Sequence, residues 1–191
     1  MKHYCDITLL PDAEANLGFL WQKVYQQIHL ALVENKIGEN HSLVAISFPE
    51  YGSKAFPLGS KLRLLAEEAA LLEGLNLSKW LNRLTDYCHY TSIKPVPAVR
   101  EYAVFRRKQF NCNVERLARR RATRKNESYE QALAHFEGFE NEQSDLPYIN
   151  SQSLSKHERF RLFIQQDKHQ DNVSGTFDCF GLSKTATVPW F

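Results

Sequence analysis

The sequence predicts an α+β protein of two domains, and two observations carry this prediction. Over the first hundred of its 191 residues, strand-like and helix-like segments follow one another in the order β-α-β-β-α-β. After Val99 the chain becomes strongly basic. We therefore expect a domain over residues 1–99 and a smaller domain over residues 100–191 that carries an arginine-rich helix. A hydrophobic fraction of 43% is enough for a packed core.

The elements of the first domain follow from apolar periodicity and from turn residues. The expected strands are residues 4–10, 43–48, 61–66 and 87–99. A helix of about 18 residues should begin at Leu17, where apolar residues recur at helical spacing. A second, leucine-rich helical region over 67–84 should divide around Gly74. This is the ferredoxin-like, or RRM-like, order, which often presents a sheet to RNA but hosts many functions.

The strongest single feature is the charge of residues 100–125. This segment carries ten Lys or Arg and two Glu, a local balance of +8 in a chain whose net charge is +2. A basic cluster in an otherwise near-neutral chain indicates a polyanionic partner, and nucleic acid is the partner that such density favours.

Within this segment we expect a helix over Val114–Lys125 with Asn113 as its N-cap. At helical spacing, four of its arginines fall within about 140° of each other, and Arg121 lies outside that arc. The four are Arg116, Arg119, Arg120 and Arg124. A merely solvated face is the alternative, but such faces usually mix the two signs of charge, and here the only acid is Glu115.

The sequence also predicts the elements on either side of this helix. Residues 106–109 are predicted to be a linker, in which Arg107 and Gln109 have side chains that can read guanine and adenine; a flexible basic linker without that task is equally open. The expected elements downstream are a helix over 127–136, an exposed acidic loop over 137–145 and β-like runs over 159–165 and 175–182.

Candidate chemistry centres on one histidine. His29 lies at the edge of the apolar stripe of the first helix, where a half-buried imidazole can face a cleft and transfer protons. A boundary histidine without a catalytic task is the alternative. Ser151 and Ser153 could bind a phosphate or a ribose hydroxyl, or be ordinary loop residues. Phe160 could stack on a base, although a strand phenylalanine is more often buried.

The sequence lacks the signatures of several other classes of protein. The four cysteines are scattered and form no C-x-x-C pair, which favours reduced thiols. The sequence has no metal-binding motif, and no carboxylates cluster near the basic segment, so we expect no metal and no cofactor. It also has no apolar run long enough to span a membrane, so we expect no membrane association. A cytoplasmic protein is expected, since no signal peptide opens the chain.

Taken in order, several short motifs resemble one known family. They are His3-Tyr4, His29, Arg107-x-Gln109, Glu115-Arg116-Leu117, Ser151-Gln152-Ser153, the strand from Arg159 to Ile164, Gly181-Leu182-Ser183-Lys184 and the final Val188-Pro189-Trp190-Phe191. Together they resemble the repeat-processing endoribonuclease of the type I-F (Csy) CRISPR system, over nearly the whole chain.

The resemblance implies an enzyme that cuts the repeat hairpins of precursor CRISPR RNA without metal. It implies that His29 is the general base and that Ser151, with Ser153 beside it, holds the nucleotide whose 2′-hydroxyl attacks the adjacent phosphate. It further implies that Arg107 and Gln109 read bases, that the helix arginines hold phosphates and that Phe160 stacks under the last base pair. The expected partners are the repeat hairpin, in precursor and mature guide RNA, and other Cas proteins of a type I-F surveillance complex.

Two positions depart from the family pattern. The active-site tyrosine that helps to orient the histidine aligns with Phe180, which cannot form such a hydrogen bond, so packing or another group must orient His29. In the arginine helix Thr123 replaces an arginine, while Arg121 is added. The alternative function is a non-catalytic hairpin-binding subunit of a ribonucleoprotein; a DNA-binding regulator is weaker, because no helix-turn-helix is evident.

Overall fold

The computed structural model describes residues 1–110, 114–137, 144–153 and 158–191. These residues form two compact units, Met1–Lys108 with Pro147–Phe191, and Gln109–Leu146. The domain division expected between residues 99 and 100 stays a prediction. Each unit is described by itself.

The first sheet has the ferredoxin-like strand order. Its strands are β1 (His3–Leu9), β2 (Val44–Ser47), β3 (Lys61–Ala66), β4 (Cys88–Tyr90) and β5 (Lys94–Pro95). They run antiparallel in the order β2-β3-β1-β4, and β5 also pairs with β1. The register places His3 opposite Ala66 and Thr8 opposite Lys61. The predicted α+β class and the βαββαβ order are confirmed.

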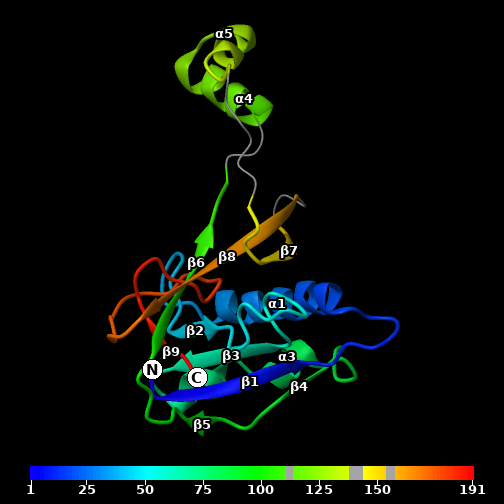
Figure 1. The fold of residues 1–191 in the computed structure, drawn as a ribbon, viewed down its shortest axis with the longest axis vertical. Helices are drawn as coiled ribbons and strands as arrows, with labels where there is room; N and C mark the ends of the chain where they lie inside the picture. The colour runs from blue at the N-terminus through cyan, green and yellow to red at the C-terminus, as the bar shows by residue number, and fades with distance from the viewer. Residues whose placement is uncertain (111–113, 138–143, 154–157) are drawn as a thin grey trace. The chain divides into compact units, whose positions relative to one another are not determined.

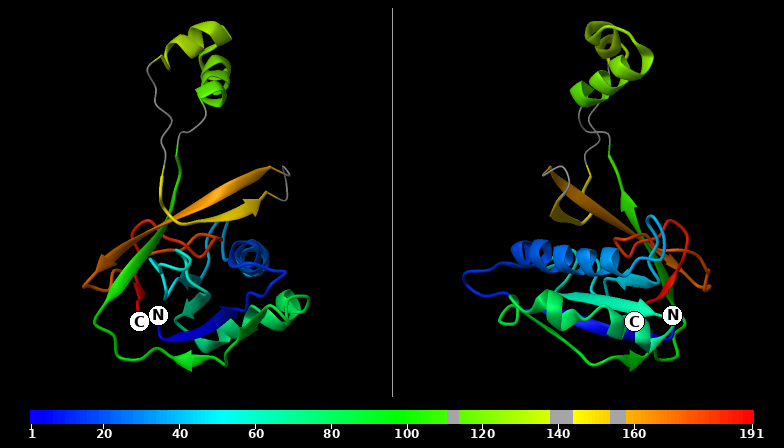
Figure 2. Two further views of the ribbon diagram at one scale, coloured as in Figure 1. Left: turned by 45° about the vertical axis from the view of Figure 1, so that its right-hand side comes forward. Right: turned by 180° about the vertical axis from the view of Figure 1, so that it is seen from behind.

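Helix α1 (Leu17–Glu34) is the central element of this unit. Asn16 caps it by accepting a hydrogen bond from the backbone N–H of Phe19. One stripe of the helix is fully buried, including Trp21, whose indole N–H donates to the carbonyl of Gly59. In both figures the helix lies between the first sheet and a second sheet (Figures 1 and 2). The residues of α1 outside the buried stripe, His29 among them, stay partly exposed and can carry functional side chains.

The leucine-rich region divides as expected. Helix α2 (Ala69–Gly74) ends at the predicted glycine and α3 (Leu77–Leu81) follows it. Asn76 joins them in a left-handed conformation, with φ of 50°. Much of the extended region predicted over 87–99 forms no ladder, since only β4 and β5 pair there.

The second sheet is where prediction and structure differ most. It has the order β7-β8-β6-β9, built from β6 (Tyr102–Lys108), β7 (Tyr148–Gln152), β8 (Arg159–His169) and β9 (Val188–Pro189). The linker expected at 106–109 is wrong for its first three residues, because the ladder with β8 continues to the pair Lys108 and Phe163. The β-like run predicted over 175–182 is wrong, because this stretch forms no strand: it has one isolated bridge, Phe177 to Ser42, and a turn at residues 179–180.

The described residues of the unit Gln109–Leu146 form two helices. Helix α4 spans Val114–Lys125, as predicted, and α5 spans Tyr129–Ala134. A capping box of Ser128 and Gln131 opens α5. Each helix buries one alanine, Ala118 or Ala132. The expected N-cap Asn113 and most of the acidic loop, at 138–143, lie outside the described residues.

Candidate active site

A pocket of about 430 Å³ joins residues from five parts of the first unit. Its lining residues are Gln26, His29, Leu30 and Val33 of α1, Arg107 of β6, Ser151 and Gln152 of β7 with the following Ser153, Phe160 of β8 and Phe180. Five residues singled out from the sequence thus meet in one place, although up to 131 residues separate the first and last of them along the chain. The β-ladder explains part of this, since Ser151 lies directly opposite Phe160.

His29 is half-buried and its ring is held from two sides. Its Nδ1 lies 2.8 Å from the backbone carbonyl oxygen of Cys179. A carbonyl can only accept, so Nδ1 carries the hydrogen and donates it. The ring of Phe180 stacks on the imidazole, with centroids 4.2 Å apart and planes 7° from parallel. In the neutral imidazole Nε2 then has a free lone pair, as a general base requires.

The surroundings of His29 favour the neutral ring. Burial lowers the pKa of His29 from 6.5, and this outweighs the hydrogen bond to Cys179 and the charge of Asp178, which both raise it. The pKa of Asp178 is itself raised by burial, against two backbone hydrogen bonds and the charge of Arg107. At neutral pH His29 is therefore mostly uncharged and able to accept a proton.

Arg107 places a positive charge beside the histidine. The centre of its guanidinium lies 5.3 Å from the ring centroid of Phe160 and 5.4 Å from that of Phe180. Its Nε is buried and has no hydrogen-bond partner among the residues that the structure describes. A buried donor without a partner is costly, and an anion or a base edge in the pocket would satisfy it.

The arginine helix belongs to the other unit. The side chains of Arg116, Arg119, Arg120 and Arg124 are all exposed, whereas Arg121 is half-buried and forms an ion pair with Glu127 at 2.6 Å. Arg119 pairs with Glu115 at 3.2 Å, one helical turn away. Thr123 donates its hydroxyl hydrogen to the carbonyl of Arg119, so it is used within the helix. Gln109 is exposed at the start of this unit.

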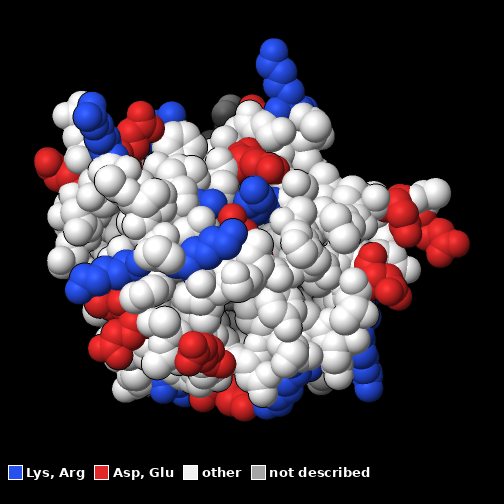
Figure 3. Space-filling model, turned by 90° about the horizontal axis from the view of Figure 1, so that it is seen from below, with Lys and Arg blue, Asp and Glu red and all other residues white. Residues whose placement is uncertain are grey.

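The arginine-rich character of α4 is local. On the face of the molecule that Figure 3 shows, basic and acidic side chains are interspersed, as on an ordinary solvated surface.

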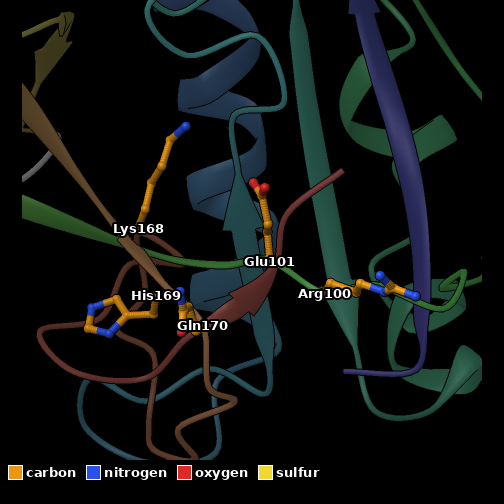
Figure 4. A pocket seen from close by; sticks show the side chains of 5 residues that line it. All are labelled: Arg100, Glu101, Lys168, His169 and Gln170. Atoms are coloured by element: carbon orange, nitrogen blue, oxygen red, sulfur yellow. The ribbon is translucent and has the colours of Figure 1, made fainter.

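A second depression, of about 570 Å³, is lined by Arg100, Glu101, Lys168, His169 and Gln170. In Figure 4 these side chains point in different directions, and that of Arg100 extends toward β1. They do not converge on a common point.

Sequence reasoning missed several residues around His29. Gln26 lies one turn before His29 on the same helix, so helical spacing was a usable signal. The turn after Asp178 also had a signal, because Asp followed by Gly three residues later is a common β-turn pattern. The carbonyl of Cys179 had none, since a backbone acceptor is independent of residue type.

Neither a metal cluster nor a membrane span is found among the described residues. No group of three or more His, Cys, Asp or Glu could hold a metal ion in that part of the chain. No helix there is both long and apolar enough to cross a bilayer. Cys5, Cys88 and Cys179 are buried free thiols, as expected for reduced cysteines, and Cys112 lies outside the described residues.

Comparison with known proteins agrees with the resemblance seen in the sequence. A family model described as "CRISPR-associated protein (Cas_Csy4)" matches residues 4–191. The chain is 35% identical, over 192 residues and the full length of both proteins, to a CRISPR-associated endonuclease Cas6/Csy4 of Escherichia coli (strain UTI89 / UPEC). It is 34% identical, again over 192 residues and both full lengths, to a protein of the same name from Pseudomonas aeruginosa (strain UCBPP-PA14). This chain belongs to the Cas_Csy4 family of CRISPR-associated proteins.

Proposed function

We propose that the chain is an endoribonuclease that cuts CRISPR repeat hairpins in precursor RNA and so releases guide RNAs. Its relatives are named CRISPR-associated endonucleases. The observation that carries the proposal is the half-buried His29, whose Nδ1–H is bonded to a carbonyl and whose Nε2 is free to accept a proton. An imidazole in this state suits proton abstraction from a ribose hydroxyl.

The reaction is a transesterification within the RNA. His29 removes the proton of a 2′-hydroxyl, and that oxygen bonds to the adjacent phosphorus while the bond from phosphorus to the 5′-oxygen breaks. The leaving oxygen takes up a proton, and the products are a 2′,3′-cyclic phosphate and a 5′-hydroxyl. Alignment and proton transfer supply the rate without a metal; the acid–base part is worth about 10² to 10⁴-fold.

The neighbours of His29 hold the substrate in this proposal. Ser151 and Ser153 bind the nucleotide upstream of the cut and align its 2′-hydroxyl. Phe160 stacks under the last base pair of the stem, and Arg107 reads the base beside it. The contact of Arg107 with the ring of Phe160 supports this pairing of roles, because both would then face the same end of the stem.

The second unit supplies affinity. Gln109 contributes a base contact, and Arg116, Arg119, Arg120 and Arg124 bind the phosphates of the hairpin. Their exposure supports this role, since phosphate oxygens can reach guanidinium groups that face solvent. Phosphate contacts fix the register of the RNA, while base contacts select its sequence.

After cutting, the protein stays bound to the 3′ hairpin of the guide RNA and joins other Cas proteins of a type I-F surveillance complex in the cytoplasm. A non-catalytic hairpin-binding subunit is the second candidate, favoured by the phenylalanine at position 180. The two candidates differ in one property, because only the enzyme cuts the hairpin.

The test uses the repeat hairpin of the host's CRISPR array, in buffer with EDTA. Wild type should cut the hairpin once, and His29→Ala should bind it with nearly unchanged affinity and leave it intact. His89→Ala is the matched control, because His89 is an exposed histidine of β4 away from the pocket. Cutting by His29→Ala would remove the general base from the proposal, and an intact hairpin with wild type would favour the non-catalytic subunit.

A further inference from the structure

We infer that the turn from Asp178 to Leu182 fixes the tautomer and the orientation of His29, and that Asp178 is a positioning residue for the cleavage reaction. The inference rests on the proposed function, in which His29 is the base. It identifies what takes over the orienting task where Phe180 has no hydroxyl. The tautomer of His29 can be measured without cleavage, so this inference and the proposed function can fail separately.

The turn touches His29 through two consecutive residues. The carbonyl of Cys179 accepts from Nδ1 at 2.8 Å, and the ring of Phe180 covers one face of the imidazole. The hydrogen bond sets the azimuth of the ring and the stacking sets its plane. An imidazole with the hydrogen on Nε2 instead would place a lone pair against the lone pairs of the carbonyl and would lose its function as a base.

The turn is itself held by the carboxylate of Asp178. One oxygen, Oδ1, accepts from the backbone N–H of Phe180 at 2.8 Å and from that of Leu182 at 3.0 Å. The backbone closes the same loop, with the N–H of Gly181 donating to the carbonyl of Asp178 at 2.8 Å. The N–H of Phe180 belongs to the same peptide group as the carbonyl of Cys179, so its bond to Asp178 fixes the direction in which that carbonyl points.

The rest of the unit anchors this turn. The buried Tyr25, one turn before His29 on α1, donates its hydroxyl hydrogen to the carbonyl of Phe180 at 2.8 Å. The N–H of Ile46 in β2 donates to the carbonyl of Gly181 at 2.8 Å. The side chain of Asn40 accepts from the N–H of Cys179 at 3.3 Å. A helix, a strand and a loop therefore all bond the turn 178–182, and together they fix the position of the Cys179 carbonyl.

Three variants separate the hydrogen bonds of Asp178 from its charge. Asp178→Ala removes the acceptor, Asp178→Asn keeps an amide oxygen at the same place without charge, and Asp171→Ala is the control in an exposed stretch of the same loop. Long-range ¹H–¹⁵N spectra of ¹⁵N-histidine-labelled protein report which ring nitrogen of His29 carries the hydrogen. The His29 signals are assigned by their absence from His29→Ala, and no RNA is needed.

Wild type, Asp178→Asn and Asp171→Ala should show the Nδ1–H tautomer at a pH where the ring is neutral. Asp178→Ala should show both tautomers and cut the hairpin roughly 10 to 100-fold more slowly, with its affinity for RNA unchanged. The cleavage of Asp178→Asn should be reduced less than that of Asp178→Ala. The inference is overturned by an Nε2–H tautomer in wild type, or by a pure Nδ1–H tautomer with full cleavage in Asp178→Ala.

If Asp178→Ala does not fold, Tyr25→Phe makes the same test more gently. It removes only the hydroxyl that anchors the carbonyl of Phe180. A mixture of tautomers and slower cutting in this variant support the inference, and an unchanged spectrum with an unchanged rate overturns it.

Discussion

Replacing Gly181 by alanine should destabilise the first unit by an amount that the structure divides into two parts. Gly181 has a φ of +71°, a region in which an L-residue costs about 1–2 kcal/mol. A Cβ atom there would lie 2.5 Å from Cγ1 and 2.9 Å from Cδ1 of Ile46. Such overpacking against a fully buried side chain costs about 1–3 kcal/mol. We therefore expect Gly181→Ala to lower the free energy of unfolding by about 2–5 kcal/mol.

Gly52→Ala is a matched control for the backbone part. Gly52 has a φ of +84°, but an added Cβ would meet nothing within 4 Å. This variant should lose only about 1–2 kcal/mol. Adding Ile46→Ala to Gly181→Ala should give a favourable coupling energy, because that change removes the two atoms that lie closest to the new methyl group.

Urea unfolding followed by tryptophan fluorescence measures these differences for the right part of the chain. All three tryptophans, Trp21, Trp80 and Trp190, belong to the unit Met1–Lys108 with Pro147–Phe191. The signal therefore reports that unit even if the helical unit unfolds separately. If Gly181→Ala costs no more than Gly52→Ala, the packing of this turn against Ile46 is not as described, and the reasoning is refuted.

Three further predictions follow from charged groups. Because burial lowers the pKa of His29, the cleavage rate at subsaturating protein should fall as pH decreases with a midpoint below 6.5, and a midpoint at or above 6.5 would contradict the assigned environment. Arg63 holds buried Asp6 through two hydrogen bonds of 2.6 and 2.9 Å, so Arg63→Met should cost about 3–5 kcal/mol in urea unfolding, and a loss below 1 kcal/mol would show that the carboxylate finds other partners. Replacing Arg119 and Arg120 by glutamine should reduce the slope of log affinity for the hairpin against log salt by about two, and an unchanged slope would place these side chains away from the phosphates.

Local signals in the sequence predicted the helices well. Helix α1 begins at Leu17 as expected, because the apolar stripe that predicted it is a local feature of the sequence. Helix α4 has the predicted bounds, and the expectation that Arg121 stands apart from the other arginines is reflected in its pairing with Glu127. Strand β3 has the predicted bounds, and four of its six residues are apolar.

The elements that sequence reasoning missed depend on partners distant in the chain. Strand β7 has the polar sequence Tyr-Ile-Asn-Ser-Gln, and it is a strand because β8 supplies its ladder. The basic residues at the end of β6 are extended for the same reason. The hydrogen bond that orients His29 joins residues 150 positions apart and uses a backbone acceptor, so no pattern of side chains could predict it.

The most direct test of the central claim changes the substrate and leaves the protein unaltered. A repeat hairpin with a single 2′-deoxyribose at the nucleotide upstream of the cut lacks the proposed nucleophile but keeps every phosphate and base. The protein should bind this hairpin as tightly as the all-ribose hairpin and should leave it uncut over a time in which the all-ribose hairpin is fully cleaved. Cleavage of the deoxy hairpin at the same bond would contradict attack by the 2′-hydroxyl, and with it the role of His29 as the base.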